Sequence, residues 1–214
     1  MAVLKNRKIA VLIAVVVAVL ATLFGVYRTS ARYTRNIEVM FYDGVYLKDE
    51  GYTQPGIGSH LNNAANAALG LATVMADGDS GMAHTAGEVL SARRDLIAAS
   101  SISDKSAANL RMWHGFLSLV SMMESEWPKA VVSGRERDAE MQFFEPFRVA
   151  SNAMSSSKYN DKVTEYLDGR SVLMRTICIL VPERKPEYFE PPDVLPPDAL
   201  SKILQSGQPP LFGD

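Results

Sequence analysis

Residues 9–27 read IAVLIAVVVAVLATLFGVY, a run of 19 residues without a charged side chain. At 1.5 Å per residue, a helix of this length measures about 29 Å, close to the roughly 30 Å hydrocarbon thickness of a bilayer. Three basic residues precede the run and three follow it, namely Lys5, Arg7, Lys8, Arg28, Arg32 and Arg35. The stretch therefore predicts one transmembrane helix in a single-pass protein of the cell membrane.

A cleaved signal peptide is the main alternative for this run. Its apolar region usually spans about 7–15 residues and ends at a small-x-small site. Here the run is longer, and the best cleavage site, Thr29-Ser30-Ala31, follows an arginine. An uncleaved anchor is therefore favoured. The basic residues balance at its two ends, so orientation is nearly undetermined, and only the amino-terminal amine slightly favours an extracytoplasmic domain.

The chain up to residue 181 predicts helices. Apolar residues recur at three- and four-residue spacing, and period-two alternation of β-branched residues is missing. The predicted segments cover residues 31–50, 57–76, 82–99, 105–126 and 133–172. Pro146, inside the last segment, either starts a helix or kinks one. We therefore predict an all-α fold, in which the transmembrane helix continues into an elongated antiparallel helical bundle.

The remaining residues differ in composition. Eight of the eleven prolines fall within residues 182–214. This composition predicts an extended or disordered tail, in which residues 198–205 are a candidate short helix. The predicted organisation is a basic segment (1–8), a transmembrane helix (9–27), a helical bundle (31–181) and a flexible proline-rich tail (182–214).

Charge argues against nucleic acid as a partner. Residues 1–36 carry six basic side chains and no acid, which leaves 16 basic and 24 acidic residues in 37–214, a net charge of −8. Such a domain repels phosphate backbones. The one cysteine, Cys178, lies in an apolar run and is interpreted as a buried thiol, and a lone cysteine excludes a disulfide within the chain.

No motif makes a convincing catalytic or metal site. Counted from Asp77, the turn fails as an EF-hand loop, because glycine is missing at position six and a ligand at position five. The S-x-x-K match ending at Lys158 lacks its partner motifs, and the histidines lack metal-ligand spacing. We expect no catalytic activity and no cofactor. The alternative is a metal-binding sensor or enzyme with a hidden acidic site, formed by Asp77, Asp79, His84 and Glu88.

A tyrosine-rich pattern marks the end of the last predicted helix. It reads Tyr159-Asn160-x-x-Val163-x-x-Tyr166 and is followed by a second aromatic pair, Tyr188-Phe189, between two glutamates. Spacings of four and three put Tyr159, Val163 and Tyr166 on one helix face. We interpret this face primarily as packing inside the bundle, with a partner-binding surface as the alternative.

These motifs resemble the LemA family. Ala92-Arg93 and Glu126-Trp127-Pro128 also look like that family's middle region, whereas Leu167 stands where the family usually has asparagine. The resemblance implies a bacterial cell-membrane protein with an elongated antiparallel bundle, and it implies no activity. We therefore expect a membrane-anchored scaffold that binds an unidentified protein through a bundle face or its tail. Self-association is a further possibility, because Ala10, Ala14 and Ala18 form a small-xxx-small face.

Overall fold

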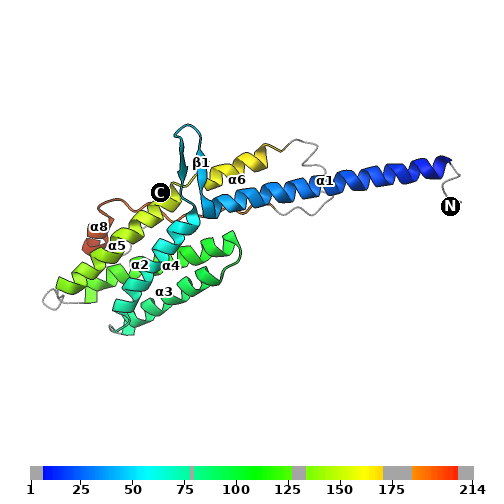
Figure 1. The fold of residues 1–214 in the computed structure, drawn as a ribbon. Coiled ribbons are helices and arrows are strands. Elements are labelled where there is room, and N and C mark those ends of the chain that lie inside the picture. The colour runs from blue at the N-terminus through cyan, green and yellow to red at the C-terminus, as the bar shows by residue number, and fades with distance from the viewer. Residues whose placement is uncertain (1–6, 78–79, 127–133, 171–184, 207–214) are drawn as a thin grey trace. The chain divides into compact units, whose positions relative to one another are not determined.

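A computed structural model of the chain describes residues 7–77, 80–126, 134–170 and 185–206. The elements are α1 (Arg7–Asp43), β1 (Val45–Leu47), β2 (Tyr52–Gln54), α2 (Ile57–Met75), α3 (Ser80–Ala98), α4 (Ile102–Glu126), α5 (Gly134–Ser155), α6 (Tyr159–Asp168) and α8 (Ala199–Ser206) (Figure 1). The prediction of a mainly helical chain that begins with a long apolar helix is confirmed.

The chain divides into two compact units. The smaller unit combines Met1–Val39 with Asp161–Pro186, and the larger unit combines Met40–Asn160 with Glu187–Asp214. Two helices, α1 and α6, therefore contribute residues to both units.

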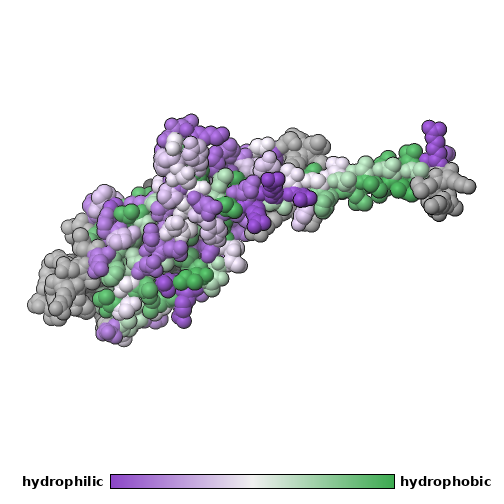
Figure 2. Space-filling model, in the orientation of Figure 1, coloured by the Kyte–Doolittle hydropathy of each residue, from purple (hydrophilic) through white to green (hydrophobic). Residues whose placement is uncertain are grey.

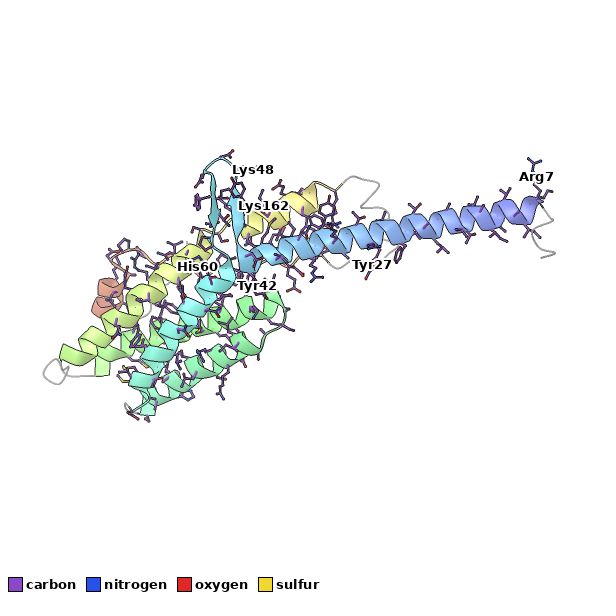
Figure 3. The ribbon with its side chains drawn as sticks, viewed as in Figure 1. Arg7, Tyr27, Tyr42, Lys48, His60 and Lys162 are labelled. Atoms are coloured by element: carbon purple, nitrogen blue, oxygen red, sulfur yellow. The ribbon has the colours of Figure 1, made fainter. Side chains whose placement is uncertain are left out.

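The first half of α1 exposes apolar side chains on all sides. Its most apolar 18-residue window has no buried residue, and Figure 2 shows this part of the helix as a hydrophobic surface. Arg7 marks the amino-terminal end of α1, and Tyr27 lies further along it (Figure 3). The helix is long and apolar enough to cross a membrane, although a signal sequence would have the same properties. A helix from the core of a soluble domain would instead be mostly buried.

The prediction of helix through residue 50 is wrong at its end. Helix α1 stops at Asp43, and Gly44 follows with a φ of 99°, a left-handed conformation that glycine adopts without steric cost. The Gly44 N–H donates to the carbonyl of Met40, which closes the last helical turn. The chain then forms the antiparallel hairpin β1–β2, with Val45 paired to Gln54. These are the two strands among the described residues.

Helices α2 to α5 form the core of the larger unit. Helix α2 packs on α3, α4 and α5, and α3 packs on α4. Alanines fill the buried face of α2, namely Ala64, Ala65, Ala67, Ala68 and Ala72. These small side chains let neighbouring helices approach α2 closely. Larger side chains in the interior come from α4 and α5. Phe116 and Phe147 stack there with ring centroids 3.8 Å apart.

The predicted stretch 133–172 is two helices rather than one. Pro146 lies inside α5 and does not end it; the chain leaves the helix after Ser155. The Gln54 side chain hydrogen-bonds to this break. Its amide nitrogen Nε2 donates to the Ser156 carbonyl, and its Oε1 accepts the Lys158 N–H. The hairpin missing from the prediction therefore supplies a residue that hydrogen-bonds to the break between α5 and α6.

The smaller unit joins α1 to α6. The hydroxyls of Ser30 and Tyr166 lie 3.1 Å apart, within hydrogen-bonding distance. The Tyr33 and Tyr166 rings also meet, with centroids 6.3 Å apart, and the Arg170 guanidinium lies 5.5 Å from the centre of the Tyr166 ring. Ser30 and Thr34 are 2% and 1% exposed. This part of α1 therefore contacts protein, unlike the apolar part before it.

Candidate functional site

Two asparagines hold residues 187–195 against helices α5 and α6 within the larger unit. Asn160, in α6, donates its amide hydrogen to the Phe189 carbonyl (2.7 Å) and accepts the Phe189 N–H (3.0 Å). Asn152, in α5, makes the same pair of bonds with Leu195, at 2.7 and 2.8 Å. A carboxamide has one donor face and one acceptor face, so it satisfies both backbone groups of an extended residue. A neighbouring β-strand would do the same.

Three hydroxyls complete this set of bonds. Ser106, in α4, donates to the Glu190 carbonyl and accepts the Glu190 N–H, both at 2.9 Å. Ser155 donates to the Pro192 carbonyl (2.6 Å), and Tyr159 donates to the Glu187 carbonyl (2.8 Å). Proline has no N–H, so one bond satisfies Pro192. We call these five residues the tail clamp (Ser106, Asn152, Ser155, Tyr159, Asn160) and residues 187–195 the bound segment.

Apolar side chains anchor the bound segment at three of its hydrogen-bonded residues. Phe189 and Leu195 are 1% and 0% exposed, and Pro192 is also buried. The Phe189 ring lies 5.6 Å from that of Phe41, which in turn meets the Tyr159 ring edge-on at 5.5 Å. The anchors are spaced three residues apart, as in a polyproline II helix, where every third residue lies on the same side.

The ends of the bound segment are also held. At its start, the Glu187 carboxylate accepts the backbone N–H of Ser103 (2.8 Å), in the first turn of α4, where the helix dipole favours a negative charge. Beyond its end, α8 packs on α4 and buries Ile203. Asp198 precedes α8, and a hydrogen bond from Lys202 lowers the pKa of its carboxyl. Hydrogen bonds and buried side chains therefore hold residues 187–203 on the helices, and the candidate short helix at residues 198–205 corresponds to α8 (Ala199–Ser206).

The structure brings together some of the predicted site residues and separates others. Tyr159, Asn160 and Phe189 meet in the larger unit, as described above. Tyr188, beside Phe189, is 49% exposed. Val163 is buried and Tyr166 meets Ser30, both within the smaller unit. The residues of the predicted face are thus divided between the two units and do not form one surface.

Sequence reasoning missed three residues of the tail clamp: Ser106, Asn152 and Ser155. Serine and asparagine are weak helix formers, because their side chains compete for backbone hydrogen bonds. Their repetition through residues 151–160 was therefore a signal that these side chains bind backbone elsewhere. That signal alone could not have identified the bound segment.

The acidic turn shows no comparable organisation. The His84 Nε2 lies 3.5 Å from the Glu88 Oε1, and both side chains are well exposed. Asp77 is exposed, and Asp79 lies outside the described residues, as does Cys178. Among residues 7–77, 80–126, 134–170 and 185–206, no three His, Cys, Asp or Glu side chains are grouped as metal ligands.

A hollow of about 530 Å³ lies between α2 and α5. Amide and apolar side chains line it, including Asn63, Asn66, Gln142 and Phe143. His60, on α2, also lines the hollow (Figure 3). Burial lowers the pKa of its imidazole. No charged carboxylate or guanidinium is among the described lining residues, so the hollow is suited to uncharged groups.

No protein-family model matches the chain, and no curated protein or solved structure is significantly similar to it. The fold thus defines the class only as a mainly helical protein with one candidate membrane-spanning helix. Within the described residues, the most organised candidate site is the tail clamp, which supplies hydrogen bonds and apolar contacts to an extended peptide. That is the chemistry of peptide recognition.

Proposed function

We propose that this protein is a single-pass, membrane-anchored helical scaffold of the bacterial cell membrane and a divergent member of the LemA family. It acts by binding another protein, and we assign it no catalytic activity. The observation that carries the proposal is the first half of α1, whose apolar side chains are exposed over the length of a bilayer. A contiguous apolar surface of this size in water would favour aggregation, so it requires a lipid or protein environment.

The continuation of α1 supports an anchor that is not cleaved. The helix runs without interruption to Asp43, well beyond the best cleavage site at Ala31. Cleavage there would remove Ser30, whose hydroxyl meets Tyr166 and whose side chain is buried. Tyr166 would then lose the Ser30 hydroxyl, although its ring would still meet Tyr33 and Arg170. The helix therefore has a structural role on both sides of the cleavage site.

The tail clamp supports protein binding and family membership together. The two motifs that resemble the LemA family, at residues 159–166 and 187–190, meet through the bonds of Tyr159 and Asn160. These bonds give a physical reason for both motifs to occur in one chain. Helices α2 to α5 are the part that we assign to the elongated antiparallel bundle, and their exposed faces are the proposed binding surfaces.

Membrane fractionation and thiol labelling test the proposal. The chain should remain in the membrane pellet after alkaline carbonate extraction, with its amino-terminal residues retained. In a Cys178→Ser background, exposed Ser91→Cys should react with an impermeant maleimide in intact cells if the domain is extracytoplasmic. Buried Ser151→Cys is the matched control and should react after denaturation only.

Three outcomes separate the parts of the proposal. Release by carbonate, or a mature chain that starts after residue 31, would disprove the anchor. Labelling of Ser91→Cys after lysis only would place the domain in the cytoplasm and leave the anchor intact. Failure to recover any cross-linked protein from native membranes would disprove the scaffold function.

A further inference from the structure

The bound segment has the properties of a peptide ligand. It pairs with side chains of the tail clamp rather than with a backbone strand, and it inserts three apolar anchors at positions 189, 192 and 195. The hydrogen bonds go to its backbone, so they recognise an extended conformation. The anchors add sequence preference, here for Phe-x-x-Pro-x-x-Leu. Extended peptides in recognition grooves are commonly read in these two ways.

The tail clamp and the bound segment belong to one unit but to separate stretches of the sequence. The chain leaves the larger unit after Asn160 and returns to it at Glu187, while Asp161–Pro186 belongs to the smaller unit. The contacts of the bound segment with the tail clamp do not depend on which chain supplies the segment. The same segment from a second copy would make identical bonds, and exchange of identical elements is a low-cost route to dimers.

We propose that the tail clamp also binds the bound segment of a second copy, which gives tail-exchanged dimers in the membrane. This inference rests on the proposed function, because the anchor would confine copies to one surface and raise their local concentration. The second copy is the partner that fits, since its segment matches the three anchors by construction. The small face of Ala10, Ala14 and Ala18 in α1 would further help two anchors to approach.

Complementary variants of the full chain test this exchange. The clamp variant, Asn152→Ala with Asn160→Ala, keeps its segment but loses four hydrogen bonds. The segment variant, Phe189→Ala with Leu195→Ala, keeps its clamp but loses two anchors. Every pair combines two chains that carry different affinity tags. A self-pair contains two copies of the same variant, and the mixed pair contains one copy of each variant. Co-purification from detergent-solubilised membranes measures association.

Exchange predicts a specific pattern. The two variants together should co-purify, because one supplies an intact segment and the other an intact clamp. Either variant with itself should co-purify at least about tenfold less, since the loss of four hydrogen bonds, or of two buried anchors, corresponds to roughly that factor or more. Equal recovery in all three pairs would assign association to the anchor and overturn the proposal. No recovery from the mixed pair or the unaltered chain would overturn it as well.

A peptide measurement remains informative if a variant folds poorly. A fluorescent peptide of residues 185–206 should bind the segment variant, whose clamp is available, and should dissociate co-purified copies of the unaltered chain. The same peptide with alanine at positions 189 and 195 is the control and should do neither. Failure of the native peptide in both assays would overturn exchange, whereas the membrane anchor is judged separately by carbonate extraction.

Discussion

Replacing Asn160 by alanine tests the tail clamp most directly. The change removes the two hydrogen bonds to the backbone of Phe189, at 2.7 and 3.0 Å. A net contribution of about 0.5–1.5 kcal/mol for each bond gives a loss of roughly 1–3 kcal/mol. Alanine is a better helix former than asparagine, which offsets up to about 0.7 kcal/mol. We expect the free energy of unfolding to fall by about 1–2 kcal/mol.

Urea unfolding of the full chain in detergent micelles measures this loss. Trp113, in the larger unit, is 3% exposed, so its fluorescence reports on unfolding of that unit. Asn62→Ala is the matched control, because Asn62 is an exposed residue of α2 and gains the same helix propensity. If Asn160→Ala is no less stable than Asn62→Ala, the bonds to Phe189 contribute nothing, and our reasoning about the tail clamp is wrong.

Asn160→Asp separates the two bonds. The aspartate keeps the shape and the acceptor for the Phe189 N–H, but it places a second oxygen against the Phe189 carbonyl. This repulsion disfavours the charged form in the folded protein and so raises the carboxyl pKa above its unfolded value. The free energy of unfolding of the variant should therefore fall furthest below that of the unaltered chain near neutral pH. The difference should shrink as pH falls and the carboxyl protonates. A pH-independent difference would argue against this contact.

Four further substitutions test local features of the larger unit. Gly44→Ala puts a methyl group against the Gln54 carbonyl at a positive φ and should lower the free energy of unfolding by about 2 kcal/mol or more. Gly51→Ala also lies at a positive φ but in open space, so it should lower the free energy of unfolding by about 1 kcal/mol. Urea midpoints compare the two variants. Gly87→Ala, in the open interior of α3, should raise the free energy of unfolding by roughly 0.5–1 kcal/mol in the same assay. His60→Gln should reduce the loss of stability on acidification below about pH 6.5: burial lowers the folded-state pKa of His60, so the unfolded chain binds more protons there. Urea titrations at pH 5.5 and 8 check this, and an unchanged pH dependence would contradict it.

Local patterns predicted the helices well. The segment predicted at 57–76 is α2 (Ile57–Met75), and its apolar periodicity matches the buried face. Periodicity failed where a single backbone conformation decided the outcome. Gly44 turns the chain out of α1, and Val45, which lies inside the predicted helical segment 31–50, is buried in a strand instead. An apolar residue at the expected spacing does not distinguish these two structures.

The tail clamp was predictable only in part. Tyr159, Asn160 and Phe189 attracted attention as motif residues, but nothing in their spacing indicated that they meet. The asparagine bonds join residues 29 and 43 positions apart, and the Ser106 bonds join residues 84 positions apart. Proline content predicted an extended or disordered tail. It could not indicate order, because order here comes from side chains elsewhere in the sequence.

The sequence by itself determined the hydropathy of the apolar run at residues 9–27, the main helical segments and the acidic charge of the rest. These are properties of neighbouring residues, set by side-chain chemistry and helical periodicity. Only the tertiary structure decided that the proline-rich segment is held and that one tyrosine motif serves two units. An extended segment has no internal hydrogen bonds, so its order depends on the partners that folding brings to it.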